Sequence, residues 1–233
     1  MATPRLRIRK LSEPTISRLP VYQRIVESFR RRGITRIESS QIAQLTGVTA
    51  TTVRRDLSGL GPLGTRGAGY DVDVLDQKIG EALGHDRTYS VVVVGMGNLG
   101  QALVNSSNFL IRGASLSALY DADPAVVGRE IAGHVVRDIN DPMIEATVGV
   151  ICTPPSAAQE VADKLVAANV HAILNFAPTV VNVPIGVAVH YVDFSIELQI
   201  LVFHLLNTMN FAGGILHSVG VTAQGQPDAR AVD

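Results

Sequence analysis

Three glycines at positions 95, 97 and 100 follow a run of β-branched residues and form the pattern Gly-x-Gly-x-x-Gly. When such a pattern links a buried parallel strand to a helix, the first glycine makes the tight turn and the second lets backbone approach a pyrophosphate. The third lets the helix pack on the strand, and the N-terminal amides of a helix over Asn98–Val104 favour an anion. The motif alone is weak, but after the strand expected over Ser90–Val94 it predicts a dinucleotide-binding loop.

A carboxylate at the end of the next strand indicates which dinucleotide this loop would take. The strand expected over Ser115–Tyr120 ends in Asp121, twenty-one residues beyond Gly100. A carboxylate at that place accepts hydrogen bonds from the hydroxyls of the adenosine ribose. It also repels a 2′-phosphate, and no Arg follows immediately, so the pattern favours NAD(H) over NADP(H).

Two further strand-and-helix units complete the predicted second half of the chain. VGVICTPPS ends a strand at Cys152, AAQEVADKLVAAN is helical, and HAILNFAP is a strand that ends near Phe176. Strands that alternate with helices predict an α/β fold with a doubly wound parallel sheet, whose ligands bind beyond the carboxyl ends of the strands. Cys152 lies in an apolar run and is expected to be a buried core thiol. The residues expected to hold the dinucleotide are Gly95, Met96, Gly97, Asn98, Leu99, Gly100, Asp121, Ala122, Asp123, Thr153, Pro154, Asn175, Phe176, Ala177 and Pro178.

The same strand-end loops lack a group that could exchange a proton with a substrate. A nicotinamide dehydrogenase needs a His, Lys or Tyr near the cofactor, whereas the side chains of Thr153–Pro154 and Asn175–Pro178 do not titrate usefully. The six histidines are scattered along the chain, and no room remains for a substrate domain. We therefore expect no catalytic residues. The alternative, an enzyme, requires that a partner subunit supply the missing base. No metal site is expected either.

The charge of the chain is unevenly distributed, although the net charge is only −1. Residues 1–84 hold fourteen Lys and Arg against eight Asp and Glu, and residues 85–233 hold six against thirteen. The basic first part is expected to meet phosphates, with a solvated cationic surface as the alternative. No apolar stretch follows the N-terminal basic residues, and the single Cys152 cannot form an internal disulfide, so we expect a cytoplasmic protein.

Helical spacing begins in this basic part after Pro14, and Pro20 is expected to begin the longer helix, which ends at Gly33. The apolar stripe consists of Ile16, Leu19, Tyr22, Ile25, Val26 and Phe29. Ser39 or Ser40 is expected to cap a short second helix.

A third helix, capped by Thr49 and expected over residues 50–60, has two unlike sides. Its apolar side holds Val53, Leu57 and Leu60. The residues expected to contact DNA from this helix are Thr51, Thr52, Arg54, Arg55 and Ser58. Guanidinium groups so placed can bind phosphate oxygens or the O6/N7 edge of guanine, as in a helix-turn-helix recognition helix. Three short helices with a basic last one also occur in proteins that bind no DNA.

A glycine-rich stretch over Gly61–Leu75 ends in alternating Val72 and Val74 and is expected to form a hairpin, or wing. Arg66 lies between glycines at its tip, where it could enter a narrow minor groove, and a plain turn is the alternative. Helix, wing and charge together predict a winged-helix DNA-binding domain over residues 1–84.

The last helical segment, FSIELQILVFHLLNTM, is apolar almost all round and must therefore be buried. It is a poor membrane span because Glu197, Gln199 and His204 interrupt it. We expect residues 196–217 to be buried against a second subunit, with an ordinary core helix as the alternative. Residues 218–233 are expected to form a loose tail.

Seven motifs in chain order make the sequence resemble the Rex family of redox-sensing transcriptional repressors, from about Ile16 to Phe203. They are ISRLPVYQRIV, VTATTVRRDLS, GTRGAGY, VGMGNLG, YDADP, ILNFAP and VDFS. The resemblance implies a homodimer that binds inverted-repeat operator DNA when NADH is scarce and releases it when NADH binds. It also implies that a Rossmann-like domain over residues 85–195 follows the winged helix, and that the C-terminal helix is exchanged between subunits.

The resemblance also implies roles for single residues. Arg54, Arg55 and Arg66 would contact DNA. Phe194 would approach the partner's nicotinamide pocket. Asp193 would act as a switch acid that pairs with Arg24 in the DNA-binding state.

Three positions depart from the family pattern. Gly59-Leu60 stands where many members have an aromatic pair, and Thr52 stands where they have Gln, which bears on operator preference. Ser106 stands where a Tyr hydroxyl commonly meets the switch acid in the NADH state, and a serine hydroxyl reaches several ångströms less far. Two alternatives stay open: an NAD-dependent oxidoreductase with an accessory DNA-binding domain, and a winged-helix regulator that responds to another nucleotide, such as a coenzyme A ester.

Overall fold

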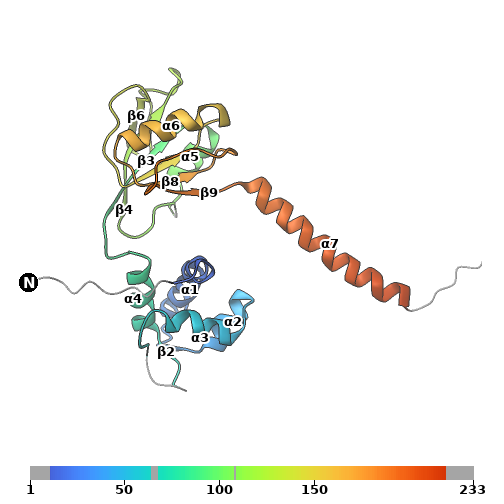
Figure 1. The fold of residues 1–233 in the computed structure, drawn as a ribbon. Coiled ribbons are helices and arrows are strands. Elements are labelled where there is room, and N and C mark those ends of the chain that lie inside the picture. Colours follow the sequence, from blue (N-terminus) through green and yellow to red (C-terminus); the bar gives the residue numbers. More distant parts are fainter. Residues whose placement is uncertain (1–10, 64–67, 108, 219–233) are drawn as a thin grey trace, which may run out of the picture. The chain divides into compact units, whose positions relative to one another are not determined.

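The computed structural model describes residues 11–63, 68–107 and 109–218, with side chains of the last helix up to residue 207. The chain divides into two compact units (Figure 1). The first holds Met1–Val91 with Leu103–Ser117, and the second holds Val92–Ala102 with Ala118–Asp233. The domain limits expected from the sequence stay a prediction.

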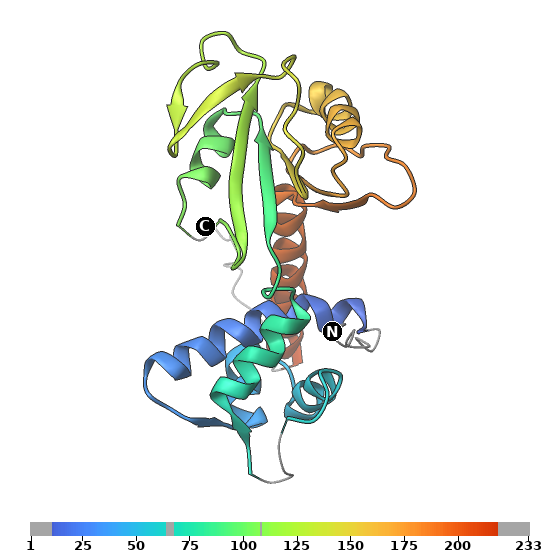
Figure 2. The same ribbon diagram turned by 90° about the vertical axis from the view of Figure 1, so that its left-hand side faces the viewer.

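Over its described residues, the first unit contains four complete helices and a small sheet. The helices are α1 (Glu13–Arg31), α2 (Ser39–Thr46), α3 (Ala50–Ser58) and α4 (Val72–Ala82). The strands β1 (Arg36–Ile37) and β2 (Tyr70–Asp71) pair antiparallel. Figure 2 shows α1, in blue, running beside α4, in blue-green. This arrangement agrees with the winged-helix class expected from the sequence.

One apolar core joins the helices of the first unit. Its fully buried members include Leu19, Tyr22, Val26, Ile37, Ile42, Val53, Leu57, Leu75 and Ile79. Because apolar burial contributes about 25 cal/mol per Å² removed from water, these side chains supply the main force that holds the helices together.

Pro20 lies inside α1, so the prediction that it begins the longer helix is wrong. The helix begins at Glu13, where the Ser12 hydroxyl accepts a hydrogen bond from the N–H of Thr15. Pro20 removes one backbone donor, but its exposed position leaves the buried stripe continuous on the opposite side. Packing of that stripe outweighs the lost hydrogen bond.

Glu38, rather than Ser39 or Ser40, stands at the N-cap of α2, which corrects the expected cap. The N–H of Glu38 donates to Oε1 of Gln41 at 2.8 Å, so the helix begins with a capping box. Gly47 ends the helix with φ of 71°, a left-handed conformation that costs glycine little.

Val72 and Val74 belong to α4, so the second half of the predicted hairpin is wrong. Asp71 caps this helix, and its Oδ1 accepts hydrogen bonds from the N–H groups of Asp73 and Val74, each at 3.1 Å. Val72 is buried while Val74 is exposed, because in a first helical turn these two residues face different sides. Arg66, at the predicted tip of the wing, lies outside the described residues.

The second unit carries most of a seven-stranded sheet with the order β5-β6-β4-β3-β7-β8-β9. The strands are β3 (Tyr89–Val94), β4 (Ala114–Asp121), β5 (Glu130–Ile131), β6 (His134–Asp138), β7 (Val148–Ile151), β8 (Ala172–Asn175) and β9 (Ala188–Tyr191). β4 with β6, β7 with β8 and β8 with β9 run parallel, whereas β5 and β6 form an antiparallel pair. The order reverses between β3 and β7, as in a doubly wound Rossmann-like sheet, which confirms the predicted α/β class.

Helices α5 (Asn98–Val104) and α6 (Pro155–Ala167) accompany this sheet (Figure 1). The buried face of α6 consists of Ala158, Val161, Ala162 and Leu165. A Cβ on Gly149 of β7 would lie 2.7 Å from the side chain of Leu165, so the glycine makes room for the helix.

The long helix α7 (Phe194–Ser218) follows β9 (Figure 1). Its large apolar side chains are between 45% and 64% exposed, namely Phe194, Ile196, Leu198, Ile200, Leu201, Val202, Phe203, Leu205 and Leu206. The alternative of an ordinary core helix is therefore wrong for a single chain, and burial against a second subunit stays a prediction. No helix in the described part of the chain combines the length and apolar character needed to cross a bilayer.

Candidate functional site

The glycine loop between β3 and α5 has the geometry that its spacing predicts. Gly95 has φ of 97°, and a Cβ there would lie 2.7 Å from the backbone carbonyl of Cys152. A Cβ on Gly100 would collide with the carbonyl oxygen of Gly95, so α5 packs directly on the turn. A Cβ on Gly97 would meet nothing within 4 Å, which leaves the backbone accessible. Only the second glycine therefore faces open space.

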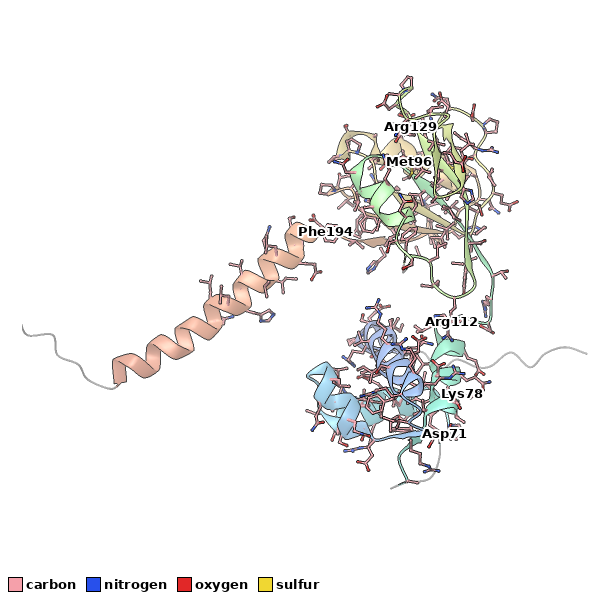
Figure 3. The ribbon with its side chains drawn as sticks, turned by 180° about the vertical axis from the view of Figure 1, so that it is seen from behind. Asp71, Lys78, Met96, Arg112, Arg129 and Phe194 are labelled. Atoms are coloured by element: carbon pink, nitrogen blue, oxygen red, sulfur yellow. The ribbon has the colours of Figure 1, made fainter. Side chains whose placement is uncertain are left out.

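Asp121, at the end of β4, fixes this loop from the neighbouring strand. Its Oδ2 accepts a short hydrogen bond from the N–H of Met96, and its Oδ1 accepts one from the N–H of Asp123 at 2.9 Å. The side chain of Met96 is fully buried (Figure 3). The backbone carbonyl of Met96 accepts a hydrogen bond from Nε2 of Gln101 at 2.7 Å. The predicted carboxylate and the predicted glycine loop thus lie together, and Asn98, Leu99, Ala122 and Asp123 flank them.

The loop after β7 offers an unused hydroxyl. Oγ1 of Thr153 is buried and has no hydrogen-bond partner in the described part of the chain. Pro154 stands at the N-cap of α6. Cys152 follows the end of β7 and is half-buried, which corrects the expected buried core thiol. Desolvation still raises the pKa of the thiol to about 12, so it stays protonated near neutral pH.

The loop after β8 is held by Asn175, which is fully buried. Its Nδ2 donates to the carbonyl of Thr179 and its Oδ1 accepts from the N–H of Ala177, both at 2.9 Å. Asn175 therefore shapes the turn through Pro178. The next residue, Phe176, packs against Phe194 with ring centroids 6.2 Å apart, so these two predicted residues meet within one chain.

Helix α3 presents its two sides as predicted. The Thr49 hydroxyl accepts from the N–H of Thr52 at 3.1 Å, and Val53 and Leu57 are fully buried. The exposed predicted residues of α3 are Thr51, Arg54, Arg55 and Ser58, while Thr52 is half-buried. The Arg54 guanidinium donates to the hydroxyls of Ser39 and Thr51, each at 3.1 Å, so α2 and the first turn of α3 itself orient it.

A buried ionic cluster that the sequence did not predict lies beneath α3. Asp56 is 2% exposed, and its carboxylate accepts four hydrogen bonds from α1. Oδ1 accepts from Nη2 of Arg18 and Oγ1 of Thr15, each at 2.9 Å. Oδ2 accepts from Nε of Arg18 at 2.7 Å and from the hydroxyl of Tyr22 at 2.9 Å. The signal was available, because Thr15, Arg18 and Tyr22 share one face of α1.

The titration of this cluster follows from its contacts. Burial alone would raise the pKa of Asp56, but the hydrogen bonds from Arg18, Tyr22 and Thr15 outweigh it, and the pKa lies below its usual range. Burial, together with the hydrogen bond to the carboxylate, raises the pKa of Tyr22 to about 12. Asp56 is therefore ionised and Tyr22 is protonated at neutral pH.

The three predicted switch residues are distributed over both units. Arg24 is exposed on α1, and Ser106 is exposed after α5. Asp193 precedes α7, where its Oδ1 accepts from the N–H of Ser195 at 2.8 Å and from its hydroxyl at 2.6 Å. These hydrogen bonds lower the pKa of Asp193. The pairing of Asp193 with Arg24 stays a prediction.

Comparison with protein families finds a match in each half of the chain. A model described as CoA binding domain matches residues 86–179, and a model described as putative DNA-binding protein N-terminus matches residues 10–58. Within the described residues, no group of three or more His, Cys, Asp or Glu could hold a metal ion.

Known proteins are similar over both halves at once. A redox-sensing transcriptional repressor Rex from Streptomyces griseus subsp. griseus is 48% identical over 206 residues, which covers 86% of this chain and 81% of the relative. The crystal structure of RSP, a repressor, with β-NAD⁺ and operator DNA has a TM-score of 0.76 at 31% identity, and covers 91% of this chain and 100% of RSP. The crystal structure of RSP with β-NADH has the same TM-score and identity, and the match covers 88% of this chain and 98% of RSP. By this identity and coverage, the chain belongs to the Rex family of redox-sensing transcriptional repressors.

Proposed function

We propose that this protein is a redox-sensing repressor that binds operator DNA as a homodimer and releases it when NADH binds. The observation that carries the proposal is the presence, in one chain, of a basic helix α3 and a glycine loop tied to Asp121. A related protein, RSP, has been crystallised with β-NAD⁺ and operator DNA and with β-NADH. The relatives are transcriptional repressors, and this chain is a regulator rather than an enzyme.

The residues around the glycine loop fit a dinucleotide. Gly97 faces open space, where backbone can approach a pyrophosphate, and Gly95 and Gly100 bring α5 against the turn. Asp121 lies beside the loop and can accept hydrogen bonds from ribose hydroxyls, which favours NAD(H) over NADP(H). The unpartnered Thr153 hydroxyl lies on the adjacent strand-end loop, next to the backbone that Gly95 touches, and can donate to the same ligand.

Release of DNA requires only that NADH bind the arrangement that cannot hold DNA more tightly than the DNA-binding arrangement, because equal affinity for both would shift nothing. When bound, NAD⁺ supplies a cationic nicotinamide ring and NADH an uncharged one. Phe176, Ala177 and Pro178 are apolar, and a pocket that they line together with Phe194 of the partner subunit would disfavour a charged ring. Such a pocket discriminates the two forms without catalysis.

DNA contacts are proposed for the first unit. Arg54 and Arg55 project from α3, and Arg66 is proposed to contact DNA from the wing. Thr51, Thr52 and Ser58 surround these cations on the same helix. The excess of Lys and Arg over residues 1–84 supports an electrostatic contribution to binding.

Dimerisation is proposed through α7, whose apolar side chains are exposed in the single chain. Exchange of this helix between subunits would bury them and bring Phe194 toward the partner's nicotinamide pocket. In the DNA-binding state Asp193 is proposed to pair with Arg24, and Ser106 is proposed to limit the NADH-state contact of Asp193. We also propose a cytoplasmic location.

One titration tests the proposal. A labelled inverted-repeat duplex, selected by the wild-type protein from a random library, is titrated with protein alone, with NADH and with NAD⁺. We expect tight binding alone and with NAD⁺, and release with NADH. Failure of NADH to bind or to release the duplex would refute redox sensing, and failure to select any duplex would refute the repressor function.

A further inference from the structure

Asp56 connects the DNA-facing helix to a single neighbour. All four hydrogen bonds on its carboxylate come from α1, and the Asp56 side chain is 1% exposed. Arg18 binds both carboxylate oxygens, a bidentate geometry that fixes direction as well as distance. The orientation of Asp56 relative to α1 is therefore closely defined.

Such a cluster contributes more to geometry than to stability. Replacing a buried ion pair by apolar residues of similar volume is often neutral or stabilising, because removing both charges from water is costly. The apolar contacts of Val53 and Leu57 hold α3 in place but are non-directional. The directional hydrogen bonds of Asp56 add to this packing and oppose rotation of α3 about its own axis.

This rotation decides where the DNA-facing cations point. Arg54 and Arg55 directly precede Asp56 in α3 and are both exposed. In a helix with 3.6 residues per turn, rotation displaces every side chain together, and long guanidinium side chains move furthest. Base reading requires side chains held within about 0.5 Å and 10–20° of the productive geometry.

We propose that Asp56, held by Arg18, Tyr22 and Thr15, is a positioning residue for sequence-specific DNA recognition. It sets the rotation of α3 so that Arg54 and Arg55 reach base edges as well as phosphates. This inference rests on the proposed function, since it names the residue that gives the repressor its sequence preference.

The first unit contains a matched control. Asp76 of α4 is also buried and accepts hydrogen bonds from Arg30 at 3.1 Å and Gln23 at 3.3 Å, both on α1. This second carboxylate ties α1 to α4 instead of α3. A change at Asp76 therefore removes a similar buried network without releasing the DNA-facing helix.

The experiment compares the full-length wild type with Arg18→Met/Asp56→Leu, Tyr22→Phe and Asp76→Asn. Each protein is titrated with the duplex that the wild type selects and with a scrambled duplex of equal composition. The paired apolar variant removes both charges but leaves the hydroxyls of Thr15 and Tyr22 without their acceptor, so it should fold with a lowered melting temperature. It should lose about tenfold in the ratio of the two affinities, the scale of one base contact. Tyr22→Phe should lose about threefold, the scale of one neutral hydrogen bond. Asp76→Asn should stay within about twofold.

Binding to the scrambled duplex and its salt dependence should not change in the paired variant, because no phosphate contact is lost. If the paired variant folds and keeps the wild-type affinity ratio, the inference is wrong. If the paired variant does not fold, Tyr22→Phe provides the test, because it keeps the aromatic ring and removes one hydrogen-bond donor to Asp56. An unchanged affinity ratio in Tyr22→Phe then overturns the inference. An equal loss in Asp76→Asn also overturns it, since the effect would be general. A wild type that does not discriminate the duplexes refutes the proposed function itself.

Discussion

The two units offer their polar groups to ligands in opposite ways. Helix α3 presents the side chains of Arg54 and Arg55, and its own position is held through the side chain of Asp56. The glycine loop presents backbone amides, and the carboxylate of Asp121 holds it by accepting from the backbone N–H of Met96. Side chains that recognise DNA must themselves be held by directional contacts. A loop that binds a ligand through its backbone instead needs glycines, because larger side chains would block the ligand.

The two regions should therefore be sensitive to different kinds of substitution. Loss of a donor or acceptor should harm the first unit, while addition of a single carbon atom should harm the second. Because the two units have separate apolar clusters, changes in one should add to changes in the other with little coupling.

Asp56→Ala should produce the largest effect. It leaves the donors of Thr15, Arg18 and Tyr22 without their acceptor, and breaking one side of a buried pair costs about 3 kcal/mol or more. Chemical denaturation followed by circular dichroism measures the loss in the helical first unit. The glycine-loop unit should keep its NADH affinity, and a loss below about 1 kcal/mol would contradict the account of the cluster.

Gly100→Ala and Gly97→Ala separate the fold of the glycine loop from its ligand contact. The added Cβ at position 100 would meet the Gly95 carbonyl, and overpacking of this kind costs about 1–3 kcal/mol. At position 97 the Cβ meets nothing within 4 Å, so stability should not change while NADH affinity falls. Thermal melting and NADH titration measure the two effects. Equal behaviour of the two variants would show that the glycines do not have separate tasks.

Lowering the pH should weaken the first unit through Asp56. The folded pKa of this group is lowered, so its contribution to stability is complete above the unfolded pKa, about 3.9, and is lost as pH falls through the folded pKa. The free energy of unfolding should therefore decline more steeply below about pH 4 in wild type than in Asp56→Asn. Denaturant titrations at pH 7, 5, 4 and 3 provide the comparison, and parallel curves for both proteins would exclude Asp56 as the source.

Arg55→Ala should give the smallest effect, a change in salt dependence. Removal of one phosphate contact should reduce the slope of log affinity against log salt by about 1. Arg112→Ala serves as the control because Arg112 is equally a cation of the first unit but pairs with Glu27 at 3.0 Å (Figure 3). Equal slopes for wild type and Arg55→Ala would remove this residue from the DNA contacts.

Local sequence patterns predicted the structure correctly where a residue type has a single structural role. The glycine spacing predicted the loop at 95–100, Asp121 ended the next strand as expected, and the two sides of α3 followed from helical periodicity. In each case the residue acts through its own backbone or through the face on which it lies.

Prediction was wrong where a pattern fits two structures. Val72 and Val74 alternate as in a strand, yet alternation over so few residues also fits a helix that Asp71 caps. The Asp56 cluster was missed because its acceptor and donors are far apart in sequence, and a carboxylate near an apolar face does not identify its partner. Pro20 was misplaced because tertiary packing outweighed the local preference.

Dimerisation through helix α7 would make the stability of the protein depend on its concentration. Its 25 residues rise about 1.5 Å each, so the helix is about 37 Å long, and its large apolar side chains up to Leu206 are exposed in one chain. In the proposed dimer those side chains are buried only after association, and mass action then links folding to the amount of protein present. A dilute sample should melt at a lower temperature than a concentrated one, and scarce copies in a cell should be lost to proteolysis before they repress anything.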